Sequence, residues 1–340
     1  MLIFHITHKC TMSFREEKIN EFFNGRRFLA VMAVAYVALS WLALQSGNIV
    51  ISHAGGGVFF PSPEALITSR VASWAANTVC TLGVCALLIT LNRMFNFVRS
   101  YTVVYASAFL LLQVGNPMAS VQFYVGTALC LVLLGASFVM FAEYQDKQRS
   151  QRSIFIAFAL VSFCCMFHYS FLFLAPVMLI GFMQMRAMNL RGLIAMVLGL
   201  VTPYWIALGM GLVDPRSFSV PQVSTIFTVI AAGTLAHAGV VTAAVTATAT
   251  VVLTAINMFT IFNYRLQTRL YNAFFAVPAL LAIMAMCIDY NNVSTYMPAL
   301  NLCLAIQVAH TFTISTALRR YLLMVVLIAA AAASYVAQLM

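Results

Sequence analysis

The chain has 340 residues, of which 63% are hydrophobic and only 8% are charged, and its formal net charge is +10. A soluble domain of ordinary composition is roughly 45–50% apolar and about 25% charged, so this composition excludes a soluble protein and makes lipid the solvent for much of the surface. The basic residues lie in short loops between apolar runs, where they act as topology signals, so we expect no nucleic-acid partner.

Backbone polar groups in lipid must be hydrogen-bonded within the protein, which leaves only helices or closed barrels as spanning structures. The apolar segments are continuous runs and lack the alternation of a barrel strand. The sequence therefore predicts an all-α fold, a polytopic transmembrane helical bundle with the lipid bilayer as its first partner.

Residues 1–26 are polar and charged, and we expect them to form a cytoplasmic N-terminal segment. Within it, residues 13–25 alternate charged side chains with Phe and Ile, a pattern typical of an amphipathic helix at a membrane surface. Residues 27–340 are predicted to form a single transmembrane domain. Its predicted spans are 28–44, 71–91, 101–114, 118–142, two short helices within 153–186, then 192–213, 240–262, 270–288, 297–314 and 321–336.

Two of these regions predict short hairpins. The span 101–114 is interrupted at Gly115-Asn116-Pro117, because proline removes a donor and disfavours helix at the residue before it. The stretch 153–186 is too long for one span of ~20 residues and short for two, which favours a hairpin with its tip at 168–170. The candidate cavity residues at the two tips are Gln113, Asn116, Gln122, Tyr124, His168, Tyr169 and Ser170.

The number of spans depends on residues 217–262, which hold either one span or two. With one span and a cytoplasmic N-terminus, only Arg70 and Arg216 of the 18 basic residues lie outside. The positive-inside bias therefore favours about 11 spans, N-in and C-out, with both short hairpins tipped outward. Such tips either line an outward cavity or pack on each other and close the bundle.

Few residues of this chain suggest chemistry. Its acids lie in loops or at span edges, its histidines show no HxxH or HExxH spacing, and its eight cysteines form no CxxC pair. We therefore expect no metal, no cofactor and no recognisable catalytic site. Threonines at 242, 246, 250 and 254 form a stripe on one face of a helix, which serves either close packing or a polar path.

The region 159–213 resembles a family of uncharacterised bacterial multi-pass membrane proteins. The resemblance lies in Phe163 with Met166-Phe167-His168-Tyr169, in Leu172-Phe173-Leu174-Ala175-Pro176, in Asn189-Leu190-Arg191, and in Gly199 with Pro203-Tyr204. Upstream, Leu91-Asn92-Arg93-Met94-Phe95-Asn96 is similar to a turn of the same family. The resemblance implies a multi-pass protein of the bacterial inner membrane and implies no particular chemistry.

These observations favour a non-enzymatic component of envelope biogenesis. Such a protein handles a lipid or saccharide substrate, for instance a lipid-linked one, or is a membrane subunit of a complex with protein partners. The alternative is an enzyme of the lipid-linked glycan transferase or polymerase class, which would use the outer-facing basic residues Arg70 and Arg216 together with His168.

Overall fold

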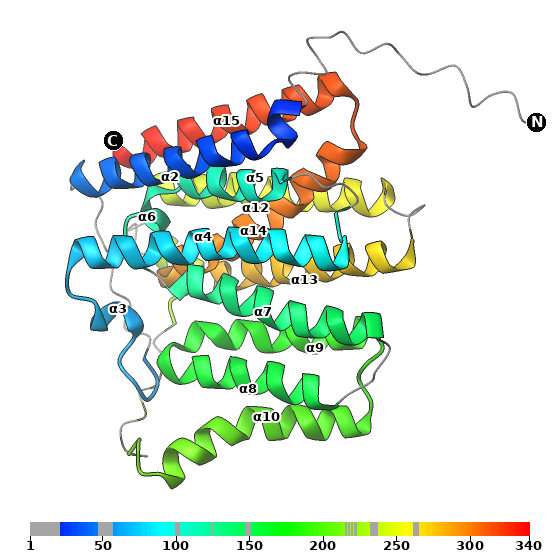
Figure 1. The fold of residues 1–340 in the computed structure, drawn as a ribbon. Helices are drawn as coiled ribbons and strands as arrows, with labels where there is room; N and C mark the ends of the chain where they lie inside the picture. The colour runs from blue at the N-terminus through cyan, green and yellow to red at the C-terminus, as the bar shows by residue number, and fades with distance from the viewer. Residues whose placement is uncertain are drawn as a thin grey trace, which may run out of the picture.

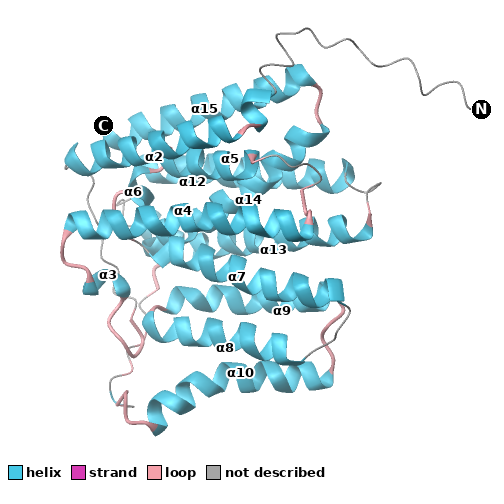
Figure 2. Cartoon of the chain, viewed as in Figure 1, coloured by secondary structure: helices cyan, strands magenta, loops and turns pink. Residues whose placement is uncertain are grey.

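A computed structural model describes residues 21–46, 57–98, 103–123, 125–146, 151–214, 216, 218, 220, 223–231, 237–260 and 265–340. Among these residues no strand forms (Figure 2), and eight helices are long and apolar enough to cross a membrane, which confirms the predicted helical bundle. The eight are α2 (Arg26–Ser46), α4 (Arg70–Phe95), α7 (Val125–Asp146), α10 (Leu190–Gly209), α12 (His237–Thr260), α13 (Leu266–Ile288), α14 (Val293–Ile314) and α15 (Ala317–Leu339).

Shorter elements connect or accompany these helices. Three are apolar and of intermediate length: α5 (Val104–Val114), α8 (Gln151–Phe167) and the continuous pair η1 (Tyr169–Phe173) and α9 (Leu174–Gln184). Four are a single turn or little more: α3 (Pro63–Leu66), α6 (Pro117–Ser120), α11 (Ile226–Ala231) and η4 (Tyr290–Asn292). The amphipathic helix predicted over 13–25 lies largely outside the described residues.

Helix α14 is at the centre of the bundle (Figure 1), where α5, α7, α12, α13 and α15 all contact it. Along its most apolar stretch of 18 residues, 83% of the residues are buried, compared with 11% along the corresponding stretches of α12 and α15. Helix α14 is therefore surrounded by protein, whereas α12 and α15 expose most of their apolar surface.

Close backbone contact fixes α7 against α14. A Cβ atom added to Gly126, at the start of α7, would lie 2.4 Å from the carbonyl oxygen of Thr295. No side chain fits in that space, so glycine allows the two helices to approach closely, as small residues do at membrane helix interfaces.

A chain of buried amides joins α14 to two of its neighbours. The Asn257 side chain on α12 donates to Gln307 Oε1 over 2.9 Å, and Gln307 Nε2 donates to Asn272 Oδ1 on α13 over 2.9 Å. All three side chains are almost fully buried. Hydrocarbon offers these groups no alternative partner, so the three helices must stay together for the amides to remain paired.

We expect Gln307→Leu to destabilise the bundle by about 1–3 kcal/mol, because it leaves the buried Asn272 oxygen without its donor. Equilibrium unfolding in detergent measures the effect. Thr248→Val is the matched control, since Thr248 is exposed and bonds only within α12, to the carbonyl of Ala244. A Gln307→Leu protein as stable as the control would contradict the role of the amide chain.

Candidate functional site

The first predicted tip, between α5 and α7, is buried in the protein. Helix α5 ends at Val114, and the Gln113 side chain just before it accepts a hydrogen bond from Asn301 on α14 over 3.0 Å. Asn116 and Gln122 are also buried, at 5% and 7% exposure. Tyr124 lies outside the described residues.

Helix α4 satisfies the non-helical backbone of this first tip. Asn77 Nδ2 donates to the carbonyls of Ala119 and Ser120 over 3.0 and 2.9 Å, and Ser73 Oγ accepts from the Phe123 N–H over 2.8 Å. Backbone groups that leave a helix at membrane depth need such partners. These bonds hold the first tip against α4.

Glu64, the one acid in the loop before α4, is buried and caps α7. Its Oε1 accepts from the N–H of Val125, the first residue of α7, over 3.1 Å. A carboxyl group suits a helix N-terminus because the helix dipole is positive there. Burial raises the pKa of the Glu64 carboxyl from 4.5 to about 7, and the hydrogen bond from Val125 opposes part of that rise.

The second predicted tip begins with His168, which has no exposed surface. Its Nδ1 accepts from the Ser170 N–H over 3.2 Å, so in the neutral ring the proton lies on Nε2, which has no partner. The His168 ring stacks on the Tyr169 ring with 5.2 Å between centroids. Ser170 is also buried.

Tyr169 reaches the turn between α13 and α14. Its hydroxyl donates to Asp289 Oδ2 over 2.9 Å, and the Asn292 amide donates both to that hydroxyl and to the carboxylate. Tyr296, on the first turns of α14, donates to the same Oδ2 over 3.2 Å. Tyr169, Asp289, Asn292 and Tyr296, which we call the Asp289 cluster, therefore tie the second tip to the central helix.

The two tips lie at the same end of the bundle, on the left in Figure 1, but they hold different partners. Among the described residues, no hydrogen bond joins the first tip to the second: Gln113 bonds to Asn301, and Tyr169 bonds to Asp289 and Asn292. Both sets of bonds end on or beside α14, at Asn301 for the first tip and at Asp289 and Asn292 for the second.

The two arginines that were predicted to face outward do not join His168. Arg70, at the start of α4, and Arg216 are both exposed, and the Arg216 N–H donates to Asp214 Oδ1 over 2.9 Å. In the described part of the chain, no hydrogen bond or ring contact links the residues on which the enzymatic alternative depends.

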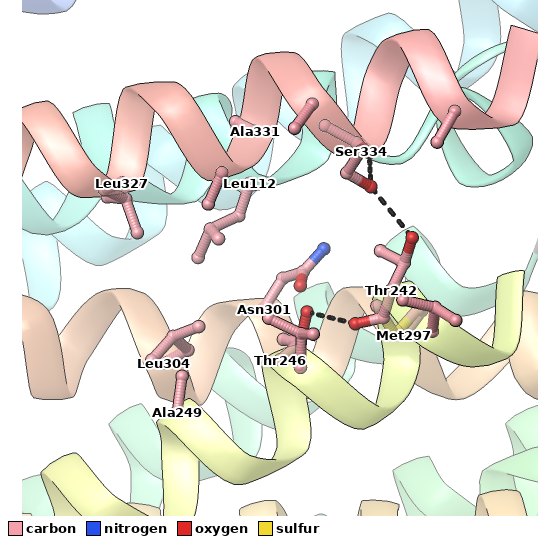
Figure 3. Close-up of a pocket in the computed structure, with 16 residues that line it drawn as sticks. Leu112, Thr242, Thr246, Ala249, Met297, Asn301, Leu304, Leu327, Ala331 and Ser334 are labelled. Carbon is pink, nitrogen blue, oxygen red and sulfur yellow. Dashed lines mark hydrogen bonds between the residues drawn. The ribbon is translucent and has the colours of Figure 1, made fainter. Parts of the chain in front are cut away.

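A groove of about 520 Å³ lies between α5, α12, α14 and α15 (Figure 3). Most of its lining is aliphatic, and its walls on α15 are small residues, among them Ala330, Ala331 and Ala333. Thr242 and Thr246, from the predicted threonine stripe, line the facing side on α12. Thr250 is instead fully buried and donates to the Thr246 carbonyl over 2.6 Å, as in helix packing.

Polar groups gather at one end of this groove. Thr242 Oγ1 and Ser334 Oγ are 2.9 Å apart, and Ser334 Oγ donates to the Gly115 carbonyl over 2.6 Å. Gln338 Nε2 donates to Thr242 Oγ1 over 3.0 Å, while the buried Gln338 Oε1 has no partner. The groove is therefore amphipathic, with an apolar body and a polar end.

Comparison with protein-family models, with curated proteins and with solved structures finds no match to this chain. The described residues hold no group of three or more His, Cys, Asp or Glu side chains that could bind a metal ion. The partners of Tyr169 were not predicted from the sequence, because Asp289 lies in a loop like the other acids of the chain. The one feature of the sequence that could have indicated these partners is the polar run from Asp289 to Asn292 between two apolar segments.

We expect the stability of the protein to fall as the pH rises towards about 7, because the folded state favours the neutral form of the Glu64 carboxyl. This stabilisation is fully present below pH 4.5 and is lost between pH 4.5 and about 7. The loss is on the order of 3 kcal/mol once Glu64 is ionised in both states. Unfolding in detergent at pH 5 and pH 8 measures it, and Glu64→Gln should remove that difference.

Glu21→Gln is the control, since Glu21 is exposed, and it should retain the pH dependence of the wild type. An unchanged pH dependence in Glu64→Gln would show that Glu64 does not titrate in this range.

Proposed function

We propose that this is an integral protein of the bacterial inner membrane that binds the hydrocarbon chain of a lipid in the groove between α12 and α15. Its role is non-enzymatic handling of a lipid in envelope biogenesis. The observation that supports this proposal is the amphipathic groove itself. The bacterial inner membrane is suggested by the family resemblance of residues 159–213.

The groove is accessible from the surface that faces lipid. Ala330, Ala333 and Ala337 line it and are exposed, so it opens along α15. Helices α12 and α15 are the least buried of the long helices, which favours contact with the bilayer. The molecules that reach such an opening first are the surrounding lipids.

The dimensions of the groove suit one lipid chain. On α15 its lining extends from Leu327 to Ala337, which is about 15 Å at ~1.5 Å per residue. That length is about half of a ~30 Å hydrocarbon core and so matches the depth of one leaflet. The volume also falls within the ~300–1,000 Å³ typical of small-molecule sites.

The polar end of the groove suits a lipid headgroup. Gln338 does not itself line the groove, but it bonds to Thr242 and Ser334 at this end. Its Oε1 is a buried acceptor without a partner, and a buried acceptor costs about 1–3 kcal/mol when left unsatisfied. A headgroup that donates a hydrogen bond there, beside Thr242 and Ser334, would satisfy it. The chain then extends away from this end along the aliphatic walls.

We further propose 11 spans, with the N-terminus inside and the C-terminus outside. Among the described residues, the eight long helices and the three shorter apolar helices add up to this number. The part of the ambiguous stretch that the structure describes before α12 holds only helix α11, with 6 residues or about 9 Å, compared with the ~30 Å of a hydrocarbon core. In this topology both short tips and the polar end of the groove face outward.

A reporter fused after Met340 tests the orientation. A periplasmic reporter, such as alkaline phosphatase, should be active at this site, whereas a cytoplasmic reporter should be silent. A fusion within residues 147–150, between α7 and α8, is the control and should show the opposite pattern. A cytoplasmic C-terminus would contradict the proposed topology.

Filling the groove tests the lipid site. Ala333→Leu adds three carbon atoms at the wall and should lower lipid retention several-fold, measured by native mass spectrometry of the full chain in mild detergent. Ala332→Leu is the matched control, because Ala332 is the exposed neighbour that does not line the groove. Equal retention by the two variants would overturn the assignment of the groove.

A further inference from the structure

The Asp289 cluster contains an acid without a basic partner. Asp289 is 3% exposed, and its carboxylate accepts only from neutral groups, the hydroxyls of Tyr169 and Tyr296 and the amide of Asn292. No Lys, Arg or His among the described residues pairs with it. A carboxylate removed from water is stabilised by hydrogen bonds and, more strongly, by an opposite charge.

The hydrogen bonds are unevenly divided between the two carboxylate oxygens. Oδ2 accepts from Tyr169, Tyr296 and Asn292 over 2.9, 3.2 and 3.0 Å. Oδ1 accepts only from Asn292, over 3.2 Å, and the same Asn292 amide nitrogen also donates to Oδ2. Because each carboxylate oxygen has about two lone-pair sites, Oδ1 retains capacity for a further donor.

Aromatic side chains lie beside this carboxylate. Tyr169 and Tyr296 contact it through their hydroxyls, and the Phe173 ring lies 5.9 Å from that of Tyr296. Tyr169 and Phe173 are only partly buried, and Asn291 beside Asp289 is exposed. The faces of aromatic rings attract cations, and aromatic rings combined with an acid recognise ammonium groups.

We propose that the Asp289 cluster binds the primary ammonium group of a ligand that enters at the α13–α14 turn. One ammonium N–H donates to Asp289 Oδ1, and the positive charge is balanced by the carboxylate. The two phenol hydroxyls point their hydrogens at Asp289, which leaves them poorly arranged as metal ligands. The proposal does not depend on the groove, whose lining has no charged residue.

Thermal unfolding of the detergent-solubilised full chain tests the site, at fixed ionic strength and pH. Ethanolamine should raise the midpoint saturably, whereas ethylene glycol, which replaces the ammonium by a neutral hydroxyl, should not. Asp289→Asn should weaken ethanolamine binding at least tenfold. Asp214→Asn, at an exposed acid, is the control and should bind as the wild type does.

Equal effects of ethanolamine and ethylene glycol on the wild type would overturn the proposal, and this comparison holds even if Asp289→Asn fails to fold. Unchanged ethanolamine binding by a folded Asp289→Asn protein would also overturn it. Ala333→Leu should leave ethanolamine binding intact, so failure of the groove and failure of this site are distinguishable.

Nanodiscs distinguish the two sources of an ammonium group. If phosphatidylethanolamine stabilises the wild type more than phosphatidylglycerol does, and Asp289→Asn removes the difference, the ligand is a lipid headgroup. If the two lipids act equally while free ethanolamine still binds, the ligand is a soluble amine. Either result, with ethanolamine binding lost in Asp289→Asn, supports the ammonium site.

Discussion

The polar side chains of α14 must find partners within the protein, and this constraint shapes the rest of the bundle. Asn301 bonds to Gln113 on α5, and Gln307 bonds to both Asn257 on α12 and Asn272 on α13. Surrounding hydrocarbon could satisfy none of these amides. Helix α14 is therefore enclosed by the helices that carry its partners, and α12 and α15 lie at the periphery of the bundle.

The groove follows from how α15 attaches to this centre. Its C-terminal half is held by polar contacts, from Ser334 to the Gly115 carbonyl over 2.6 Å and from Tyr335 to the Leu39 carbonyl over 2.9 Å. Between these contacts and α12, the residues of α15 are mostly alanines, whose side chains are too small to fill the space. An amphipathic opening thus remains between two helices whose apolar stretches are mostly not buried in the protein.

The sequence was sufficient to predict the helical bundle, because long uncharged runs in a chain with 8% charged residues have few other stable forms. It also singled out Tyr169 and Gln113, which the structure places in hydrogen bonds to the α13–α14 region. It did not identify their partners, Asp289 and Asn301, since a single amide or a loop acid does not disturb an apolar pattern.

The groove could not be predicted, because it depends on the packing of two helices that are far apart in the chain. Thr242 and Ser334 are separated by 92 residues, and α13 and α14 lie between them in the sequence. Their contact therefore depends on the tertiary packing of the whole C-terminal half. From the sequence, the threonine stripe was compatible either with close helix packing or with a polar path. The structure divides it, with Thr242 and Thr246 at the groove and Thr250 buried in a contact within its own helix.

The most direct test of a lipid site between α12 and α15 is an electron cryo-microscopy map of the full chain in lipid nanodiscs. Elongated density should extend beside Ala330 and Leu327, with its thicker end near Gln338 and Ser334. A map in which α12 and α15 close on each other, with protein side chains filling the space beside Asn301, would contradict a lipid-binding groove.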